Sequence, residues 1–239
     1  MLPKLDVPTY QIELPLSKKK IKYRPFLVKE QKNLLMAVES QEAESIHNAI
    51  KDVLENCTIT ENVNIDELPI IDIEYYFINL RAKSVGEIVE LKYRCNNTVD
   101  GKNCNNLMDV SFNLQDVKVT NNEINPEVQI TDNITIKLKY PEFGAVKDSL
   151  DPNSVADTTF SMIANSIEYI YDGQQFYYAK EVQKKELIEF IESMNQTQFS
   201  KMEQFFNNLP EIKENLDVKC KKCGFEHHIE VEGLENFFE

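Results

Sequence analysis

Four cysteines, in two pairs that lie far apart in the chain, are the residues best suited to bind a metal. Cys220 and Cys223 form a C-x-x-C-G motif with Gly224, and Cys95 and Cys104 form a wider pair with eight residues between them. Two intervening residues place both sulfur atoms on one edge of a tetrahedron, and the glycine lets backbone amides point at them. Four thiolates are a ligand set of structural zinc sites. The sequence therefore predicts one structural Zn²⁺ held by Cys95, Cys104, Cys220 and Cys223.

Other uses of these cysteines stay open: two disulfides, free thiols, or redox chemistry at the C-x-x-C motif. Residues 1–7 show no apolar signal core and no later segment approaches a membrane span, so we expect a reducing cytosol, which disfavours disulfides. A redox C-x-x-C opens a helix, whereas the residues after Gly224 alternate like a strand. Either His227 or His228 could replace one cysteine, but not both, because neighbouring strand residues point to opposite faces.

Two β-hairpins are expected to position the cysteines. Residues 87–94 and 108–112 flank the first pair with strand-forming residues, and residues 216–231 contain the second pair in a similar setting. A shared metal would close a loop of more than a hundred residues between the hairpins. Closing such a loop corresponds to about 4–5 kcal/mol of chain entropy. We therefore expect that loss of the metal would loosen the whole protein.

The first part of the chain predicts both strands and helices. Residues 10–14 and 21–26 alternate like a hairpin, and residues 28–38 and 46–57 have the composition or periodicity of helices. Within the second helix, Cys57 is expected to be a core thiol and His47 a residue at the flank of the apolar stripe. The segment 68–81 is apolar nearly all round, which is typical of a helix that is buried centrally or docks on a partner.

The later part predicts strands followed by helices. Strands are expected around the turn Asp132–Asn133, and a hairpin around Asp172–Gly173. Apolar periodicity predicts a helix at residues 160–167 and two more between residues 187 and 209. Asn195 and Gln198 suit a capping box at the start of the last helix, and Pro210 a stop at its end.

Together these patterns predict an α+β fold, in which helices pack around short antiparallel hairpins. The two cysteine-bearing β-hairpins would form a split zinc ribbon. The turn-rich stretch from residue 140 to residue 154 is the best candidate for a boundary. We expect an N-terminal α+β region, residues 1–143, and a mainly helical region, residues 144–239, joined by the shared zinc site.

The composition disfavours several classes of function. With 42% hydrophobic residues, the 239-residue chain can bury a sizeable core. Its 26 basic and 40 acidic residues give a net charge of −14, which repels a phosphate backbone, so we expect no nucleic-acid partner. Neither a glycine-rich phosphate loop nor a known hydrolase or metalloprotease motif is present. We expect no catalytic residues, no small-molecule substrate and no stable membrane insertion.

Several segments of the amino-acid sequence also resemble a known protein family. Residues 2–10, 20–30, 80–87 and 220–238 closely resemble the baseplate hub assembly proteins of T4-like contractile-tailed bacteriophages, and the resemblance covers essentially the whole length. It implies a non-enzymatic role in building the central baseplate hub, as an assembly chaperone or as a minor structural component. It also implies hub proteins as partners, and the cytoplasm of an infected bacterium or the virion baseplate as the location.

Such a factor would cover an apolar or edge-strand surface of a hub subunit. The N-terminal arm, the apolar helix and the aromatic tail are candidate contact elements, although each also has an ordinary structural explanation. The candidate partner-binding residues are Tyr10, Ile73, Phe77, Leu234, Phe237 and Phe238.

Two other functions remain as alternatives. The first is a zinc-ribbon adaptor in phage transcription or nucleic-acid binding, which Lys219, Lys221 and Lys222 beside the C-x-x-C motif would favour. The second is a metal-dependent enzyme, which would need a metal position open to water. Four thiolates would leave no such position.

Overall fold

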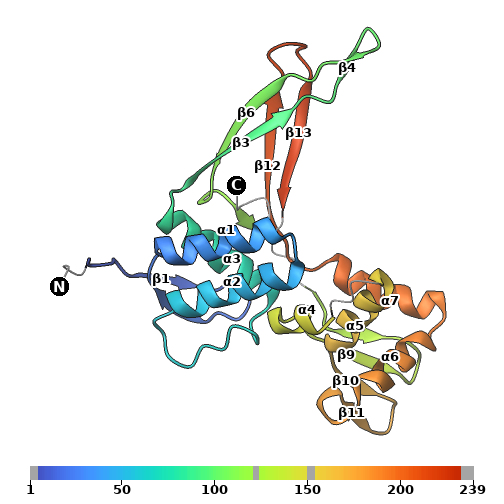
Figure 1. Ribbon diagram of the computed structural model, residues 1–239. Helices are drawn as coiled ribbons and strands as arrows, with labels where there is room; N and C mark the ends of the chain where they lie inside the picture. The colour runs from blue at the N-terminus through green and yellow to red at the C-terminus, as the bar shows by residue number, and fades with distance from the viewer. Residues whose placement is uncertain (1–4, 121–123, 150–153, 233–239) are drawn as a thin grey trace.

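The computed structural model describes residues 5–120, 124–149 and 154–232. Figure 1 shows a helical body, a second lobe of helices and strands, and an arm of two long hairpins that extends away from both. Strands in the described ranges pair antiparallel in several small sheets, which confirms the predicted mixture of helices and short hairpins. No helix in these ranges combines the length and the apolar character needed to cross a bilayer.

The N-terminal body packs a hairpin against three helices. Tyr10 of the first strand lies opposite Tyr23 of the second, which confirms the predicted hairpin. Cys57 is fully buried in the core of this body, as expected for a core thiol. The elements of the body are β1 (Tyr10–Glu13), β2 (Lys20–Tyr23), α1 (Val28–Ser40), α2 (Ala43–Cys57) and α3 (Ile70–Ser84).

Helix α3 lies between two hydrophobic clusters, which explains why its sequence is apolar nearly all round. Ile73 and Phe77 face the core of the body, where they are 0% and 1% exposed. Ile78 and Ala82, on another face, pack in the cluster at the base of the arm. Asp72, which is also fully buried, accepts hydrogen bonds from the backbone N–H groups of the β1–β2 loop.

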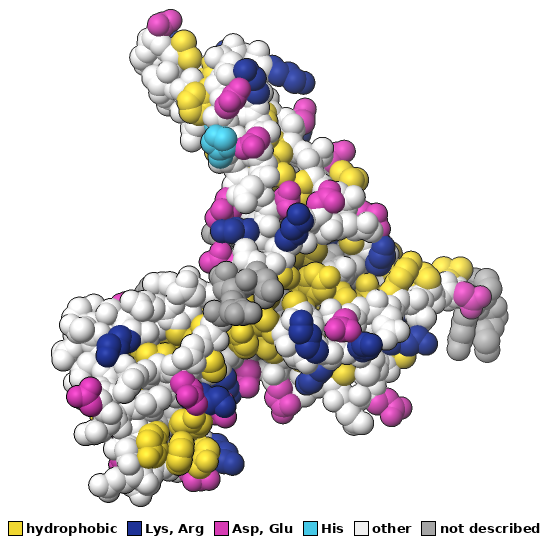
Figure 2. Space-filling view, turned by 180° about the vertical axis from the view of Figure 1, so that it is seen from behind, with side chains coloured by type: hydrophobic (Ala, Val, Ile, Leu, Met, Phe, Trp, Pro, Cys, Tyr) yellow, Lys and Arg dark blue, Asp and Glu magenta, His cyan; other side chains and the backbone are white. Residues whose placement is uncertain are grey.

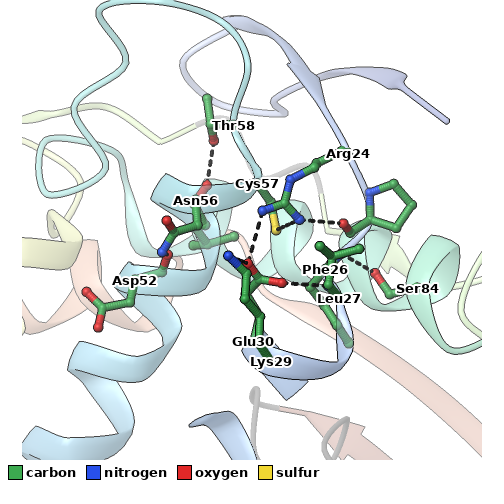
Figure 3. Close-up of polar contacts among 12 residues, drawn as sticks. Arg24, Phe26, Leu27, Lys29, Glu30, Asp52, Asn56, Cys57, Thr58 and Ser84 are labelled. Carbon is green, nitrogen blue, oxygen red and sulfur yellow. Dashed lines mark hydrogen bonds and ion pairs between the residues drawn. The ribbon is translucent and has the colours of Figure 1, made fainter. Parts of the chain in front are cut away.

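A buried ion pair fixes the start of α1 (Figure 3). Glu30 accepts a hydrogen bond from Arg24 Nη2 at 3.0 Å and another from the backbone N–H of Leu27 at 2.6 Å. Burial alone would raise the pKa of Glu30, but these bonds lower it overall. Arg24 Nη1 also lies 3.7 Å from Cys57 Sγ, whose pKa burial raises to about 11. This network joins α1 and α2 to the hairpin.

The second lobe combines a four-stranded sheet, in the order β11-β10-β9-β8, with helices. The Asp172–Gly173 turn forms the predicted hairpin, and Asn195 and Gln198 form the predicted capping box. The elements are β8 (Glu127–Gln129), β9 (Thr135–Leu138), α4 (Phe143–Ser149), α5 (Val155–Asn165), β10 (Ile167–Tyr171), β11 (Phe176–Tyr178), the 3₁₀-helix Ala179–Glu181, α6 (Lys184–Glu192) and α7 (Gln196–Asn207).

The packing does not follow a division between residues 143 and 144. Strand β9, which precedes this point, pairs with β10, which follows it. Ile136 and Leu138 are accordingly buried in the core of the second lobe, whereas Phe143 is buried in the core of the N-terminal body. Strand pairing across the turn-rich stretch therefore places residues 127–138 with the later helices.

The arm consists of two hairpins whose strands run side by side (Figure 1). Val89 and Phe112 of the first hairpin pack at the base of the arm with Ile212 and Val231 of the second. The arm contains β3 (Ile88–Arg94), β4 (Thr98–Val99), β5 (Lys102–Asn103), β6 (Leu107–Asn113), β7 (Lys118–Val119), β12 (Ile212–Lys219) and β13 (Glu226–Glu232).

Candidate metal centre

The four predicted cysteines meet toward the far end of the arm, where the turns of the two hairpins approach each other. Their sulfur atoms all lie within 4.8 Å of one another. The Cys95 and Cys223 sulfurs are 3.6 Å apart, and the Cys104 and Cys220 sulfurs are 3.8 Å apart. Cys223 is half-buried and the other three are buried. All four are free thiols rather than disulfides.

The C-x-x-C motif forms a tight turn between β12 and β13. The backbone N–H of Cys220 donates to the Phe225 carbonyl, and that of Gly224 donates to the Cys220 carbonyl, both at 2.8 Å. Gly224 has φ +74°, in the left-handed region that a residue without a Cβ adopts readily. This turn aims backbone amides at the sulfurs, as the sequence predicts.

These amides change the acidity of the thiols. The backbone N–H of Cys223, followed by that of Lys222, holds the pKa of Cys220 down at about 6. The N–H of Phe225 and the side chain of Asn97 lower the pKa of Cys223. Burial, together with the neighbouring cysteines, raises the pKa of Cys95 to about 12. A cluster of this kind stabilises some thiolates strongly but cannot ionise fully without a cation.

The first cysteine pair is brought together because its spacer folds back on itself. Strands β4 and β5 form a small hairpin within the spacer, with Asp100 and Gly101 at its tip in left-handed conformations. The backbone N–H of Cys95 donates to the Asn106 carbonyl, and that of Cys104 to the Asn97 carbonyl, both at 2.8 Å. The wide spacing thus places both sulfurs on the side of the turn that faces the second hairpin.

Three further side chains contact the sulfurs across the two hairpins. Asn97 and Asn106 of the first hairpin direct their Nδ2 groups at Cys223 and Cys220 of the second, each at 3.6 Å. His227 of the second hairpin places Nε2 3.2 Å from Cys95 Sγ of the first. No sequence signal marks the two asparagines, since their contacts depend on how the hairpins align. The sequence offered His227 as a possible replacement for one cysteine, but not as a neighbour of Cys95.

The two neighbouring histidines point to opposite faces, as expected for strand residues. His227 is buried between Tyr93 and Phe225, with ring centroids 5.5 and 4.8 Å away. His228 is exposed and pairs with Asp217. Among the described residues, the group of mutually close ligand atoms contains the four cysteines and neither histidine.

The donor set fits a tetrahedral zinc ion. Zinc–sulfur bonds of about 2.3 Å in a tetrahedron separate neighbouring sulfurs by about 3.8 Å. Two separations in this cluster, 3.6 and 3.8 Å, match that edge, and all of them are within 4.8 Å. Cys95, Cys104, Cys220 and Cys223 could hold Zn²⁺ with little rearrangement.

The other predicted site residues lie away from the cysteines. Tyr10 is half-buried beside Tyr23, with Lys83 Nζ 5.7 Å from its ring centroid. Ile73 and Phe77 lie in the core of the body and are 0% and 1% exposed, so a contact of either residue with a partner stays a prediction. Leu234, Phe237 and Phe238 lie outside the described residues.

The sequence predicted His47 at the flank of the apolar stripe of α2, but the structure buries this side chain. It is only 7% exposed, its ring stacks on Phe143 at 4.0 Å, and its Nε2 lies 3.0 Å from the Phe143 carbonyl oxygen. The start of α4 covers it, and the periodicity of α2 alone could not reveal this contact.

Comparisons with known proteins point to one family. A family model described as T4 bacteriophage base plate protein matches residues 7–239. The chain is 24% identical to the baseplate hub assembly protein gp26 of Enterobacteria phage T4 over 232 residues, which cover 96% of this chain and 98% of that protein. No solved structure gives a significant match. The chain therefore belongs to the T4 bacteriophage base plate protein family.

Proposed function

We propose that this protein acts without catalysis in assembling the central hub of a contractile-tailed phage baseplate, through contacts with hub proteins. The observation that carries the proposal is similarity over nearly the entire chain to a protein named for hub assembly. The similarity spans the body, the second lobe and the arm, so it is not limited to a cysteine motif that unrelated proteins share. The work would take place in the cytoplasm of the infected bacterium.

Exposed aromatic side chains support a role in protein contacts. Phe176, Tyr177 and Tyr178 of β11 are 52%, 40% and 42% exposed. In Figure 2, hydrophobic side chains gather over this part of the second lobe. Aromatic residues are enriched in protein interfaces, and β11 lies at the edge of its sheet. Contacts by Tyr10 and by residues 234–239 remain predictions.

A zinc ion bound by the four cysteines would be structural. Cys95, Cys104, Cys220 and Cys223 would hold Zn²⁺, which supplies a cross-link between the two hairpins. The amides and side-chain N–H groups around the sulfurs would stabilise the four thiolates. With four sulfur ligands, the ion would have no position for a substrate or a reactive water.

Interruption of the gene in the phage tests the proposed function. We expect infected cells to accumulate tail intermediates that lack a hub, and a plasmid copy of the intact gene to restore complete particles. Normal yields of infectious particles from the interrupted phage would contradict the proposal.

Mass spectrometry would then distinguish the two forms of the proposal. The protein should be present in infected-cell lysate but absent from purified virions if it is a transient assembly factor. Stoichiometric presence in virions would identify it as a structural component of the hub.

The nucleic-acid alternative has weaker support. Of the three lysines at the C-x-x-C motif, Lys219 pairs with Glu226 at 3.0 Å and Lys222 donates to the Cys104 carbonyl at 3.0 Å. These contacts hold the turn together and reduce the charge offered to a phosphate. We expect no shift of a DNA fragment at low salt, whereas a salt-sensitive shift would favour the adaptor alternative.

A further inference from the structure

A groove of about 740 Å³ lies between α1 and α3, with the start of α2 at one end. Leu35 and Val38 of α1 form one side, and Phe77 and Val85 line the other. Leu35 is 53% exposed and Val85 is 56% exposed, so large apolar side chains face solvent here. Grooves of this size and character typically receive an apolar ligand or segment.

Arg81 gives the groove a positive charge. It is 9% exposed and lines the groove one turn after Phe77 on α3. The lining contains no acidic side chain among the described residues, although the whole chain has a net charge of −14. Burial lowers the pKa of Arg81, so an incoming carboxylate would stabilise its charged form. The chemistry of the groove therefore suits an apolar segment with an acidic side chain.

The end of β13 shares a hydrophobic cluster with α3, which also lines the groove. Val231 belongs to this cluster together with Ile78 and Ala82, and these two residues directly follow the groove residues Phe77 and Arg81 in the helix. The seven residues 233–239 come next and lie outside the described residues. Seven extended residues reach about 23–25 Å, roughly twice the diameter of a helix. This length is enough to pass around α3 into the groove.

The sequence of residues 233–239 matches the groove in composition. It contains Leu234, Phe237 and Phe238, and the acidic residues Glu235 and Glu239. We propose that this segment binds in the groove, with its large apolar side chains against α1 and α3 and an acidic side chain beside Arg81. The inference goes beyond the hub assembly role and does not depend on it. A partner that bound the tail would first have to remove it from the groove.

Photo-cross-linking in the full-length protein tests this proposal. A benzoylphenylalanine replaces Leu35 in one sample and Met36 in another. The two positions are neighbours on α1 and are 53% and 57% exposed, but only Leu35 lines the groove. After irradiation and digestion, position 35 should be joined to a peptide from residues 233–239 and position 36 should not. Absence of that product, or its equal formation from both positions, would overturn the proposal.

Variants of the segment, combined with benzoylphenylalanine at position 35, provide a second readout while the other groove residues stay unchanged. The double substitution Phe237→Ala and Phe238→Ala should weaken docking by at least about tenfold, because each phenylalanine loses apolar burial. The pair Glu235→Gln and Glu239→Gln should weaken it less, through loss of the charge contact. Circular dichroism should show an unchanged fold in both. A cross-link from position 35 that both variants leave unaltered would contradict the assignment.

Mixing isotope-labelled and unlabelled protein identifies the chain that supplies the segment. Cross-links should join peptides that carry the same label. Products with mixed labels would assign the groove to a second copy of the protein and overturn binding within one chain.

Discussion

Asn97 and Asn106 donate N–H groups to cysteine sulfurs of the opposite hairpin, and His227 Nε2 lies 3.2 Å from the Sγ atom of Cys95. A zinc ion with four thiolates has an excess of two negative charges, and burial of that charge costs free energy unless donors surround it. These three residues would therefore favour the metal-bound state and also fix the alignment of the hairpins. His227 is the most buried of the three, so its contribution should be the easiest to measure.

The substitution His227→Phe should weaken zinc binding by roughly 10–100-fold, as is typical when a partner of a metal ligand is lost. Phenylalanine can still fill the space between Tyr93 and Phe225, so the fold should persist. Competition with a chromophoric chelator would measure the affinity. His228→Gln is the matched control, because His228 lies on the exposed face and should leave the affinity unchanged. Equal affinities for the two variants would show that the His227 contact is unimportant.

Glu30 should make stability depend on pH. Its pKa is lower in the folded protein, so it contributes stability above its unfolded pKa and loses this contribution as pH falls through the folded value. Glu30→Gln should cost about 1.5–3 kcal/mol at pH 7, through loss of bonds to a charged group.

The difference in stability between wild type and Glu30→Gln should shrink as the pH falls below 4.5, the ordinary pKa of a glutamate carboxyl. Urea unfolding at several pH values would measure it. Glu189→Gln is a suitable control, because Glu189 forms an exposed pair with Lys185 and should change stability by less than about 0.5 kcal/mol. A difference that grew toward acid pH would contradict the assignment.

At the scale of elements, α3 connects the body to the arm. One face holds the core of the body, another supports the base of the arm, and its first turn holds the β1–β2 loop through Asp72. The carboxylate of Asp72 accepts from Leu16 N at 2.7 Å and from Ser17 N at 2.8 Å. A single buried side chain therefore ties a hairpin to a helix more than fifty residues later.

Asp72→Ala should lower the free energy of unfolding by at least about 2 kcal/mol, because two backbone donors lose their acceptor. Hydrogen exchange should accelerate first at the amides of Leu16 and Ser17. Asp52→Ala on the exposed side of α2 serves as the control and should have little effect. If exchange at Leu16 and Ser17 stayed unchanged in Asp72→Ala, the proposed tie would be incorrect.

The sequence was sufficient to predict elements whose signals are local. Alternation revealed the β1–β2 hairpin, Asp172–Gly173 revealed a turn, and Asn195 with Gln198 revealed a helix start. It could not predict pairings that depend on distant partners. The pairing of β9 with β10 was missed because a turn-rich stretch lies between them. For the same reason, the cysteines were identified from their chemistry, but the contact of His227 with Cys95 was not.

At the scale of the molecule, separate hydrophobic clusters support the body, the second lobe and the base of the arm. The cysteines form a fourth cluster with Met108, near the far end of the arm. The two hairpins belong to different sheets, so few backbone hydrogen bonds join them at that end. A metal ion bound there would cross-link segments that are distant in sequence.

Removal of the metal by a chelator should therefore loosen the far end of the arm first. Hydrogen exchange should accelerate most around Cys95, Cys104, Cys220 and Cys223, and less at the amides of α3 and β9. Loss of the cross-link should lower Tm by on the order of 10 °C, from the loop entropy and the size of the chain. Cys223→Ser should behave like the chelated protein. Equal Tm with and without chelator would mean that no metal contributes to the fold.

X-ray absorption at the zinc edge of the purified protein would show whether four cysteines hold a zinc ion. We expect one zinc ion per chain with four sulfur neighbours at about 2.3 Å. A protein without zinc, or a zinc ion with nitrogen or oxygen ligands in place of sulfur, would contradict it.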